Sequence, residues 1–234
     1  MQPESAQELI STNNDRKALY EFLATVYAKE ITVDFLRELR TKTDFLLDAA
    51  GDLEIRGTEM ADGFKQISRY ASSLKEEVLE SVRLDLAVEF ARLFLGVGHM
   101  RFHPSESSYM TREHLVMQKP RDLVVKVYRD MGAAKVNGFA EPEDYIALEL
   151  QFMAYLCEKT NIALRGDDLL ATRKYLEVQR DFLNEHLGKW VPKLTADIIR
   201  SSKSEFYKSA AKITKGYVEE DKKTVLEMID TINA

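Results

Sequence analysis

A cluster of carboxylates near the middle of the chain has the residue types best suited to chemistry. Glu141, Glu143 and Asp144 surround Pro142. Acidic residues on a short connector are typical of binding surfaces. They are equally typical of a helix start, where they complement the positive end of the helix dipole. Two interpretations therefore stay open for this cluster, a binding site and a well-formed helix start.

The residues after the cluster predict the helix that would carry it. Ile146, Leu150, Met153 and Cys157 recur at i, i+4, i+7 and i+11, which is the spacing of one buried helix face. Pro142 suits the first helical position, where no amide proton is needed. We therefore expect this helix to begin at the proline and to run to about residue 160.

Apolar residues follow helical periodicity along almost the whole chain, and strand-type alternation is scarce. A chain of 234 residues can bury a full core. We therefore expect an all-α protein, a single globular domain over 1–234 with about ten helices. The expected helices are a first one capped by Asp15, followed by 33–50, 64–74, 76–95, 111–131 as one or two helices broken near Pro120, 142–160, one from Asp167 or Asp168 to 187, 190–199 and 204–232.

Composition and charge narrow the class of partner. The net charge of −6 and the pI near 5.4 argue against nucleic-acid binding and favour a cationic partner. Cys157 is the one cysteine, so no intrachain disulfide can form, which fits a reducing compartment. No signal peptide is recognisable at the N-terminus, and no stretch approaches about 18 uncharged apolar residues. We expect a cytoplasmic protein without membrane insertion.

Three stretches resemble the TorD/DmsD family of cytoplasmic chaperones, and together they run through roughly half of the chain. The segment 141–153 reads Glu-Pro-x-Asp-Tyr-Ile-x-x-Glu-Leu-x-Phe-Met. Segments 89–96 and 104–109 read Glu-Phe-Ala-Arg-Leu-Phe-Leu-Gly and Pro-Ser-Glu-Ser-Ser-Tyr, and 182–192 contains His-Leu-x-x-Trp-x-Pro. The family pattern usually has His after Glu-Pro-x-Asp, and here Tyr145 stands at that position.

The resemblance implies an all-helical TorD-like fold and a function in binding. Family members are not enzymes. They recognise the twin-arginine leader peptide of a molybdopterin oxidoreductase of the DMSO/TMAO reductase type, and some also bind the immature enzyme. Cofactor insertion is assisted in this way and premature export is held back. A second possibility within the family is a related client that lacks an exported leader.

The physical requirements of such a leader match the acidic cluster. Guanidinium groups prefer two-pronged carboxylate partners, and an apolar stretch fits a groove between helices. The resemblance assigns peptide binding to a set of polar and aromatic residues from all three stretches. They are Glu106, Ser107, Tyr109, Glu141, Pro142, Asp144, Tyr145, Glu149 and Trp190.

Each assignment has a structural alternative. Pro142 and Asp144 suit a helix start, and the three residues from 104–109 suit a braced loop. Trp190 suits the core, and Glu149 suits either a solvated surface or support for the acidic cluster. If the family His acts by protonation, Tyr145 cannot replace it at neutral pH. If the His acts as a flat surface that forms hydrogen bonds, Tyr145 can replace it.

Two further classes stay open from the sequence. His99 and His103 stand at i+4, which suits zinc on a helix, and Glu106 is close by. No second ligand pair and no Glu-x-x-His follows, so we expect no metal and no cofactor. A helical scaffold that only dimerises is the other class. The connector 133–140 is a candidate hinge, so we expect a monomer or a homodimer, with exchange of helices between protomers as one form of the dimer.

Overall fold

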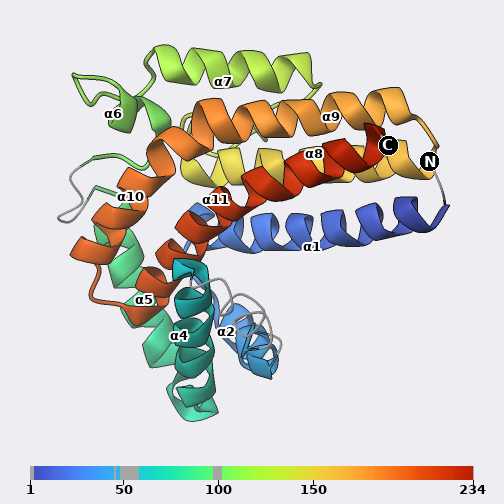
Figure 1. The fold of residues 1–234 in the computed structure, drawn as a ribbon. Helices are drawn as coiled ribbons and strands as arrows, with labels where there is room; N and C mark the ends of the chain where they lie inside the picture. Colours follow the sequence, from blue (N-terminus) through green and yellow to red (C-terminus); the bar gives the residue numbers. More distant parts are fainter. Residues whose placement is uncertain (1–2, 45, 48–57, 97–101, 234) are drawn as a thin grey trace. The chain divides into compact units, whose positions relative to one another are not determined.

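The computed structural model describes residues 3–44, 46–47, 58–96 and 102–233, and these fold into helices joined by turns (Figure 1). The all-α prediction is therefore confirmed. The α-helices are α1 (Pro3–Ala28), α2 (Val33–Thr41), α4 (Glu59–Ser73), α5 (Leu79–Phe94), α6 (Glu106–Met110), α7 (Lys119–Asp130), α8 (Ile146–Arg165), α9 (Leu169–Phe182), α10 (Gly188–Ser201) and α11 (Glu205–Asn233). A 3-10 turn (Glu76–Val78) precedes α5, and a π-helical turn (Leu183–Leu187) joins α9 to α10.

The chain forms two compact units. Unit 1 consists of Met1–Tyr27, Pro104–Trp190 and Val218–Ala234, and unit 2 consists of Ala28–His103 and Val191–Tyr217. The single domain expected over 1–234 stays a prediction. No helix in the described part of the chain is long and apolar enough to cross a membrane.

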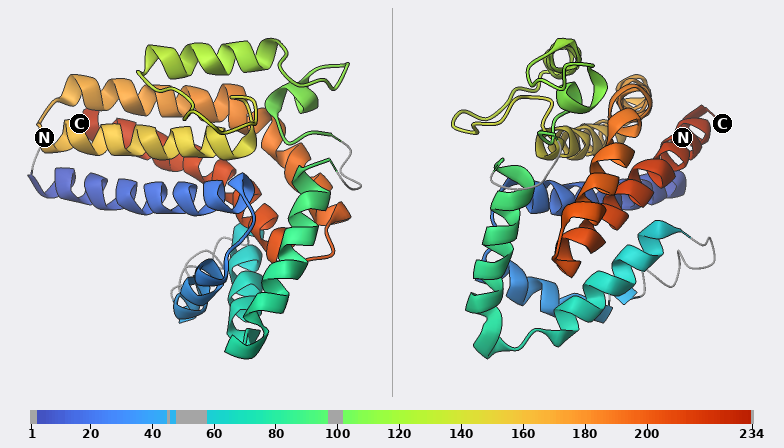
Figure 2. Two further views of the ribbon diagram at one scale, coloured as in Figure 1. Left: turned by 180° about the vertical axis from the view of Figure 1, so that it is seen from behind. Right: turned by 90° about the vertical axis from the view of Figure 1, so that its left-hand side faces the viewer.

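Unit 1 is organised around α1, α8 and α9, which run side by side in Figures 1 and 2. A buried ion pair ties them to the last part of α11. Arg16 donates two hydrogen bonds to Asp221, 2.6 and 2.9 Å long, and a third to Gln179 of α9. Tyr20 donates to the same Asp221 carboxylate. A buried charge is costly without partners. This network therefore fixes how α1, α9 and the last part of α11 are aligned along one another.

α7 covers this group of helices through an aromatic contact. The ring of Tyr128 lies 4.4 Å from the ring of Phe152 in α8 and 6.2 Å from that of Phe182 in α9. Aromatic pairs at these distances stabilise beyond the apolar area they bury. α7 is thereby placed beside the start of α8, where the acidic cluster lies.

Unit 2 has an aromatic core at the beginning of α11. Phe206 packs against Phe35 of α2 and Tyr70 of α4, with ring centroids 6.1 and 5.9 Å apart. Tyr207 packs edge-on against Phe94 of α5 at 5.6 Å. Residues distant in sequence therefore meet at the first turn of α11.

Several expected helix boundaries were wrong. α1 already runs through Asp15, so this residue caps no helix, and α4 begins at Glu59 after a cap by Thr58. α8 continues to Arg165 through the stretch expected to link two helices. Asp168 caps α9 as expected, since its side chain accepts from the amide of Ala171. The predicted end of a helix at Gly51 lies outside the described residues.

The segment 104–109 was expected to be a loop, but Glu106–Met110 forms the short helix α6. Gly188 was expected to end a helix, but the chain stays helical from α9 into α10. A Cβ at Gly188 would lie 2.5 Å from the carbonyl oxygen of Leu183. The glycine therefore accommodates the wide backbone of the π-helical turn, and Pro192 lies inside α10.

Two glycines allow α4 and α11 to cross closely within unit 2. A Cβ at Gly63 would lie 2.7 Å from Cγ1 of Ile213, and a Cβ at Gly216 would lie 2.6 Å from Cβ of Met60. Real Cβ atoms do not approach other atoms so closely. α11 is helical on both sides of Gly216, so close packing against α4 accounts for this glycine.

We predict that Gly216→Ala destabilises the protein by about 1–3 kcal/mol, because the added methyl group forces α4 and α11 apart. Urea unfolding followed by circular dichroism measures the change. Gly166→Ala is the control, since its Cβ would lie 3.5 Å from the nearest atom, which is an ordinary contact. Equal stability of the two variants would show that the crossing is not tight.

Candidate functional site

The two segments that carry the acidic residues of the site are joined by backbone hydrogen bonds. Ser105 and Tyr145 form an antiparallel bridge. The amide of Glu106 donates to the carbonyl of Asp144 at 2.9 Å, and the amide of Ile146 donates to the carbonyl of Pro104 at 3.0 Å. Two of the three stretches singled out in the sequence therefore meet in unit 1.

This bridge explains why the expected start of α8 was wrong. α8 begins at Ile146, and Tyr145 occupies the N-cap position with an extended backbone. Pro142 is therefore not the first helical residue, and Glu143 and Asp144 do not lie in the first turn. Pairing with Pro104–Glu106 requires an extended backbone at Tyr145, and this pairing prevails over the helix-start pattern.

Asp144 holds the start of α6 and is fully buried, with 0% of its surface exposed. Its Oδ2 accepts a hydrogen bond from the amide of Ser107 at 2.7 Å. Burial raises the pKa of Asp144, and the Ser107 amide opposes that rise. The carboxylate thus satisfies a backbone donor of a short helix that has no cap from Ser105.

Tyr145 is buried and acts as a hydrogen-bond donor. Its hydroxyl donates to the carbonyl of Tyr27, in the last turn of α1, at 2.9 Å. Phe139 packs edge-on against its ring at 6.0 Å. A phenol keeps its proton at neutral pH, so this position works without a charge.

Glu149 is the centre of a buried polar chain that joins four elements. The indole N–H of Trp190 in α10 donates to Glu149 Oε2 at 3.0 Å. Glu106 of α6 lies close enough to the Glu149 carboxyl to raise its pKa. His186 Nδ1, in the π-helical turn, lies 2.8 Å from Glu106 Oε2. Tyr109 completes the group, with its ring 5.7 Å from that of Trp190.

The Glu149 carboxyl is buried close to a second buried carboxyl, that of Glu106. Glu149 is 0% exposed, and burial followed by repulsion from Glu106 raises its pKa well above the usual range. Within the described part of the chain, no donor reaches its second oxygen, Oε1. The raised pKa favours the neutral form of Glu149 beside Glu106, whose Oε2 lies 2.8 Å from His186 Nδ1. The arrangement avoids two adjacent buried negative charges.

The surface of the site is formed by Glu141, Pro142 and Glu143, which are partly exposed. Glu143 already has internal partners. Arg121 of α7 donates to its Oε2 at 2.6 Å, and Lys135 Nζ lies 3.9 Å from its Oε1. The hydrogen bond from Arg121 lowers the pKa of Glu143, so this carboxylate is ionised at neutral pH.

The same side of unit 1 contains a mainly apolar pocket of about 370 Å³. It is lined by the connector that follows α7 and by one face of α8. The residues that line it include Val136, Leu148, Phe152 and Tyr155. The connector leads directly to Phe139 and the acidic cluster, so the pocket and the cluster belong to one continuous stretch of chain.

The structure brings together most of the residues predicted for the site. Some of them are buried, and others lie at the surface. Trp190, Tyr109 and Ser107 are buried with the carboxylates described above, and Glu141 and Pro142 remain at the surface. Sequence reasoning missed His186 and Arg121 as partners of the site. His186 stands in the third family stretch, which was a signal, whereas nothing in the sequence pointed to Arg121.

The alternative of a metal site gains no support from the described residues. Among residues 3–44, 46–47, 58–96 and 102–233, no three His, Cys, Asp or Glu side chains are placed to hold a metal ion. His99, one of the two histidines considered for zinc, lies outside these ranges.

Comparisons with known proteins show the family to which the chain belongs. Residues 57–196 match the family model described as nitrate reductase delta subunit. A chaperone protein TorD from Aliivibrio salmonicida is 30% identical over 196 residues, 80% of this chain and 83% of the relative. Those from Aliivibrio fischeri and a Psychrobacter species are 28% and 26% identical. They cover 86% and 97% of this chain and 89% and 98% of the relatives.

The fold, the site and these matches define the class as a helical maturation chaperone that is not an enzyme. The family model spans more than half of the chain, and the relatives cover most of it. This chain belongs to the TorD family of chaperones for molybdoenzyme maturation. Its partner is accordingly a redox-enzyme client.

We predict that Glu149→Gln removes a pH dependence of the folding stability. A raised folded-state pKa means that the carboxyl contributes its full stability below the unfolded value of 4.5 and loses it as pH rises through the folded value. Relative to the variant, the natural protein should lose up to about 1.4 kcal/mol per pH unit in that interval. Glutamine keeps an N–H for Glu106 and an oxygen for Trp190.

Urea unfolding between about pH 5 and pH 9 tests this prediction, with the emission of Trp190 as the probe because it is the one tryptophan. Glu158→Gln is the matched control, since its side chain on the same helix is 42% exposed. Parallel stability curves for the natural protein and Glu149→Gln would show that Glu149 is ionised in the folded chain.

Proposed function

We propose that this chain binds the twin-arginine leader of a molybdopterin oxidoreductase of the DMSO/TMAO reductase type in the cytoplasm. Binding of the leader, and of the immature enzyme body, assists cofactor insertion and delays export. The observation that carries the proposal is the pairing of an apolar pocket with a fixed acidic surface in one unit. A leader offers arginines beside an uncharged apolar stretch, which is the complementary chemistry.

The acidic surface would receive the leader arginines. Glu141 and Glu143 are the accessible carboxylates. At Glu143, a leader arginine would have to replace the internal cations, and the free-energy cost of breaking those ion pairs is small. The pairs of Glu143 with Arg121 and Lys135 are partly exposed, and exposed ion pairs contribute about 0.2–1 kcal/mol each. A guanidinium from the leader can therefore replace or join these cations at little cost.

The apolar pocket would supply most of the affinity. Burial of apolar surface contributes about 25 cal/mol per Å², so a few large side chains outweigh the ion pairs. Val136 and Leu148 line the pocket, and Val136 is 77% exposed. Burial of Val136 against an apolar leader residue would therefore contribute directly to the free energy of binding.

The remaining predicted site residues would act by positioning the surface. Asp144, Tyr145 and Glu149 are buried, and so are Trp190 and the three residues of α6. They hold Glu141 and Pro142 in place through the hydrogen bonds described above. A preformed surface loses less conformational entropy on binding, which increases affinity.

Calorimetric titration with a synthetic leader peptide tests this function. We expect micromolar binding that weakens when both leader arginines become alanine. Glu143→Gln should weaken binding about two- to fivefold through the lost ion pair, and Val136→Ser by about threefold or more through the lost apolar contact. On Glu143→Gln, the two leaders should differ less than on the natural protein, because the partners act as a pair.

The controls are matched in chemistry. Leu170→Ser removes an apolar side chain that is 83% exposed in α9 and does not line the pocket. Glu158→Gln removes a carboxylate outside the acidic surface. Leader binding unchanged in Glu143→Gln and Val136→Ser would reject this site. No binding to several different leaders would favour a client without an exported leader.

The connector 133–140 would also permit exchange of helices between two copies. It is irregular and partly exposed, and Gly138 has a φ of 92° that other residues rarely adopt. Light scattering at increasing protein concentration distinguishes a monomer from a homodimer. A dimer that converts to monomer only after unfolding would identify helix exchange.

A further inference from the structure

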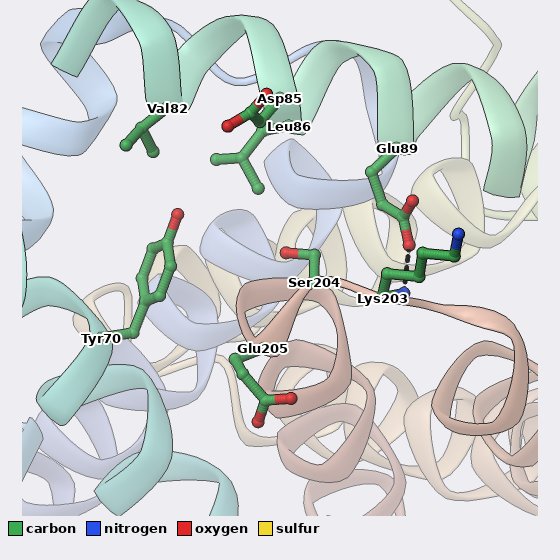
Figure 3. Close-up of a pocket in the computed structure, with 8 residues that line it drawn as sticks. All are labelled: Tyr70, Val82, Asp85, Leu86, Glu89, Lys203, Ser204 and Glu205. Carbon is green, nitrogen blue, oxygen red and sulfur yellow. Dashed lines mark hydrogen bonds between the residues drawn. The ribbon is translucent and has the colours of Figure 1, made fainter. Parts of the chain in front are cut away.

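Unit 2 contains a pocket of about 360 Å³ that the proposed leader site does not use (Figure 3). It lies between α4, α5 and the turn that precedes α11. Tyr70, Val82 and Leu86 supply most of its apolar lining. Its volume falls within the range of about 300–1,000 Å³ that is usual for ligand sites.

Two polar groups in the described part of the chain face this pocket without a hydrogen-bond or ion-pair partner. The hydroxyl of Tyr70 points from α4 toward α5 in Figure 3. Asp85 is exposed on α5 and also lines the pocket. Within the described ranges, no hydrogen bond or ion pair engages either group. Burial of the ring and the nearby Asp85 raise the pKa of Tyr70 to about 12, so the hydroxyl keeps its proton.

The inner end of the pocket is already occupied by protein contacts. Glu89 accepts hydrogen bonds from Ser202 Oγ at 2.7 Å, from the Lys203 amide at 2.5 Å and from Arg92 at 2.9 Å. These bonds hold the turn between α10 and α11. Glu89 therefore fixes one wall of the pocket and has no capacity left for a ligand cation.

The charges at the opening select the sign of the ligand. Asp85 and Glu205 are both exposed there, and Lys203 is the one cation among the lining residues. Glu205 pairs with Lys208 one turn away, with 62% of its side chain exposed, and such pairs are weak. An anion would meet two carboxylates, whereas a cation gains them together with the face of an aromatic ring.

We propose that this pocket holds the side chain of an arginine from the client polypeptide. Its alkyl stem would lie against Val82 and Leu86, and its guanidinium would stack on Tyr70 and donate to Asp85. Arginine fits better than lysine because its planar head both stacks and donates to a carboxylate in two-pronged fashion. The proposal rests on the proposed function only for the identity of the partner, a client chain.

The test uses the full chain with labelled Val and Leu methyl groups and N-acetyl-arginine amide as the ligand. Nuclear magnetic resonance should show millimolar binding that shifts the methyl signals of Val82 and Leu86. N-acetyl-citrulline amide, which has nearly the same shape and no charge, should not bind. Asp85→Asn should weaken arginine binding at least about threefold, and Asp34→Asn, an exposed residue of α2 that does not line the pocket, should leave it unchanged.

The outcomes separate this pocket from the leader site. Shifts that are equal with arginine and citrulline, or that survive Asp85→Asn in full, would overturn the arginine pocket. Leader binding without arginine shifts at Val82 and Leu86 would overturn the pocket and leave the proposed function intact. Arginine shifts without any leader binding would reject the proposed function and retain the pocket. Circular dichroism of Asp85→Asn confirms that the variant is folded.

Discussion

The need to neutralise three buried carboxyl groups is the constraint on which the rest of the site depends. Glu106, Asp144 and Glu149 lie inside unit 1, and each is accommodated differently. Asp144 accepts a hydrogen bond from a backbone amide, Glu106 lies beside His186, and burial raises the pKa of Glu149. Since an unpartnered buried charge costs several kcal/mol, these requirements bring α6, α8, the π-helical turn and α10 into one arrangement. The wide turn at Leu183–Leu187 then has a clear role, because it places His186 opposite Glu106.

In the proposed function, the buried network positions the site and the surface above it contacts the client. The inner residues are almost inaccessible to solvent, so the proposed function gives them no direct contact with a client. In the proposed function they position the partly exposed Glu141 and Glu143 near the apolar pocket. Internal cations at Glu143 keep that carboxylate ionised, so it is ready to exchange partners. In this proposal the apolar pocket supplies most of the affinity, and the charged surface next to it supplies the selectivity. Both belong to unit 1.

Tyr145 shows how a departure from a family pattern can be explained by its contacts. The family motif usually has histidine here, and a histidine would titrate near neutral pH. The phenol instead donates to the carbonyl of Tyr27 at the end of α1 and stays neutral. This contact ties the first helix to the acidic segment. In this chain the position therefore joins two parts of unit 1 independently of pH.

The sequence alone determined the helical class, most of the helices and the family, because apolar spacing and short motifs are local properties of the chain. The residues that it assigned to peptide binding stay a prediction. It placed the start of α8 too early at Pro142 and ended a helix at Gly188, because a backbone bridge to 104–106 and a close carbonyl approach are not local. Only the tertiary structure decided which carboxylates are buried, which of them have a raised pKa and which cation meets Glu143. Those properties depend on distance in space and on exclusion of water, and neither is encoded by the spacing of residues along the chain.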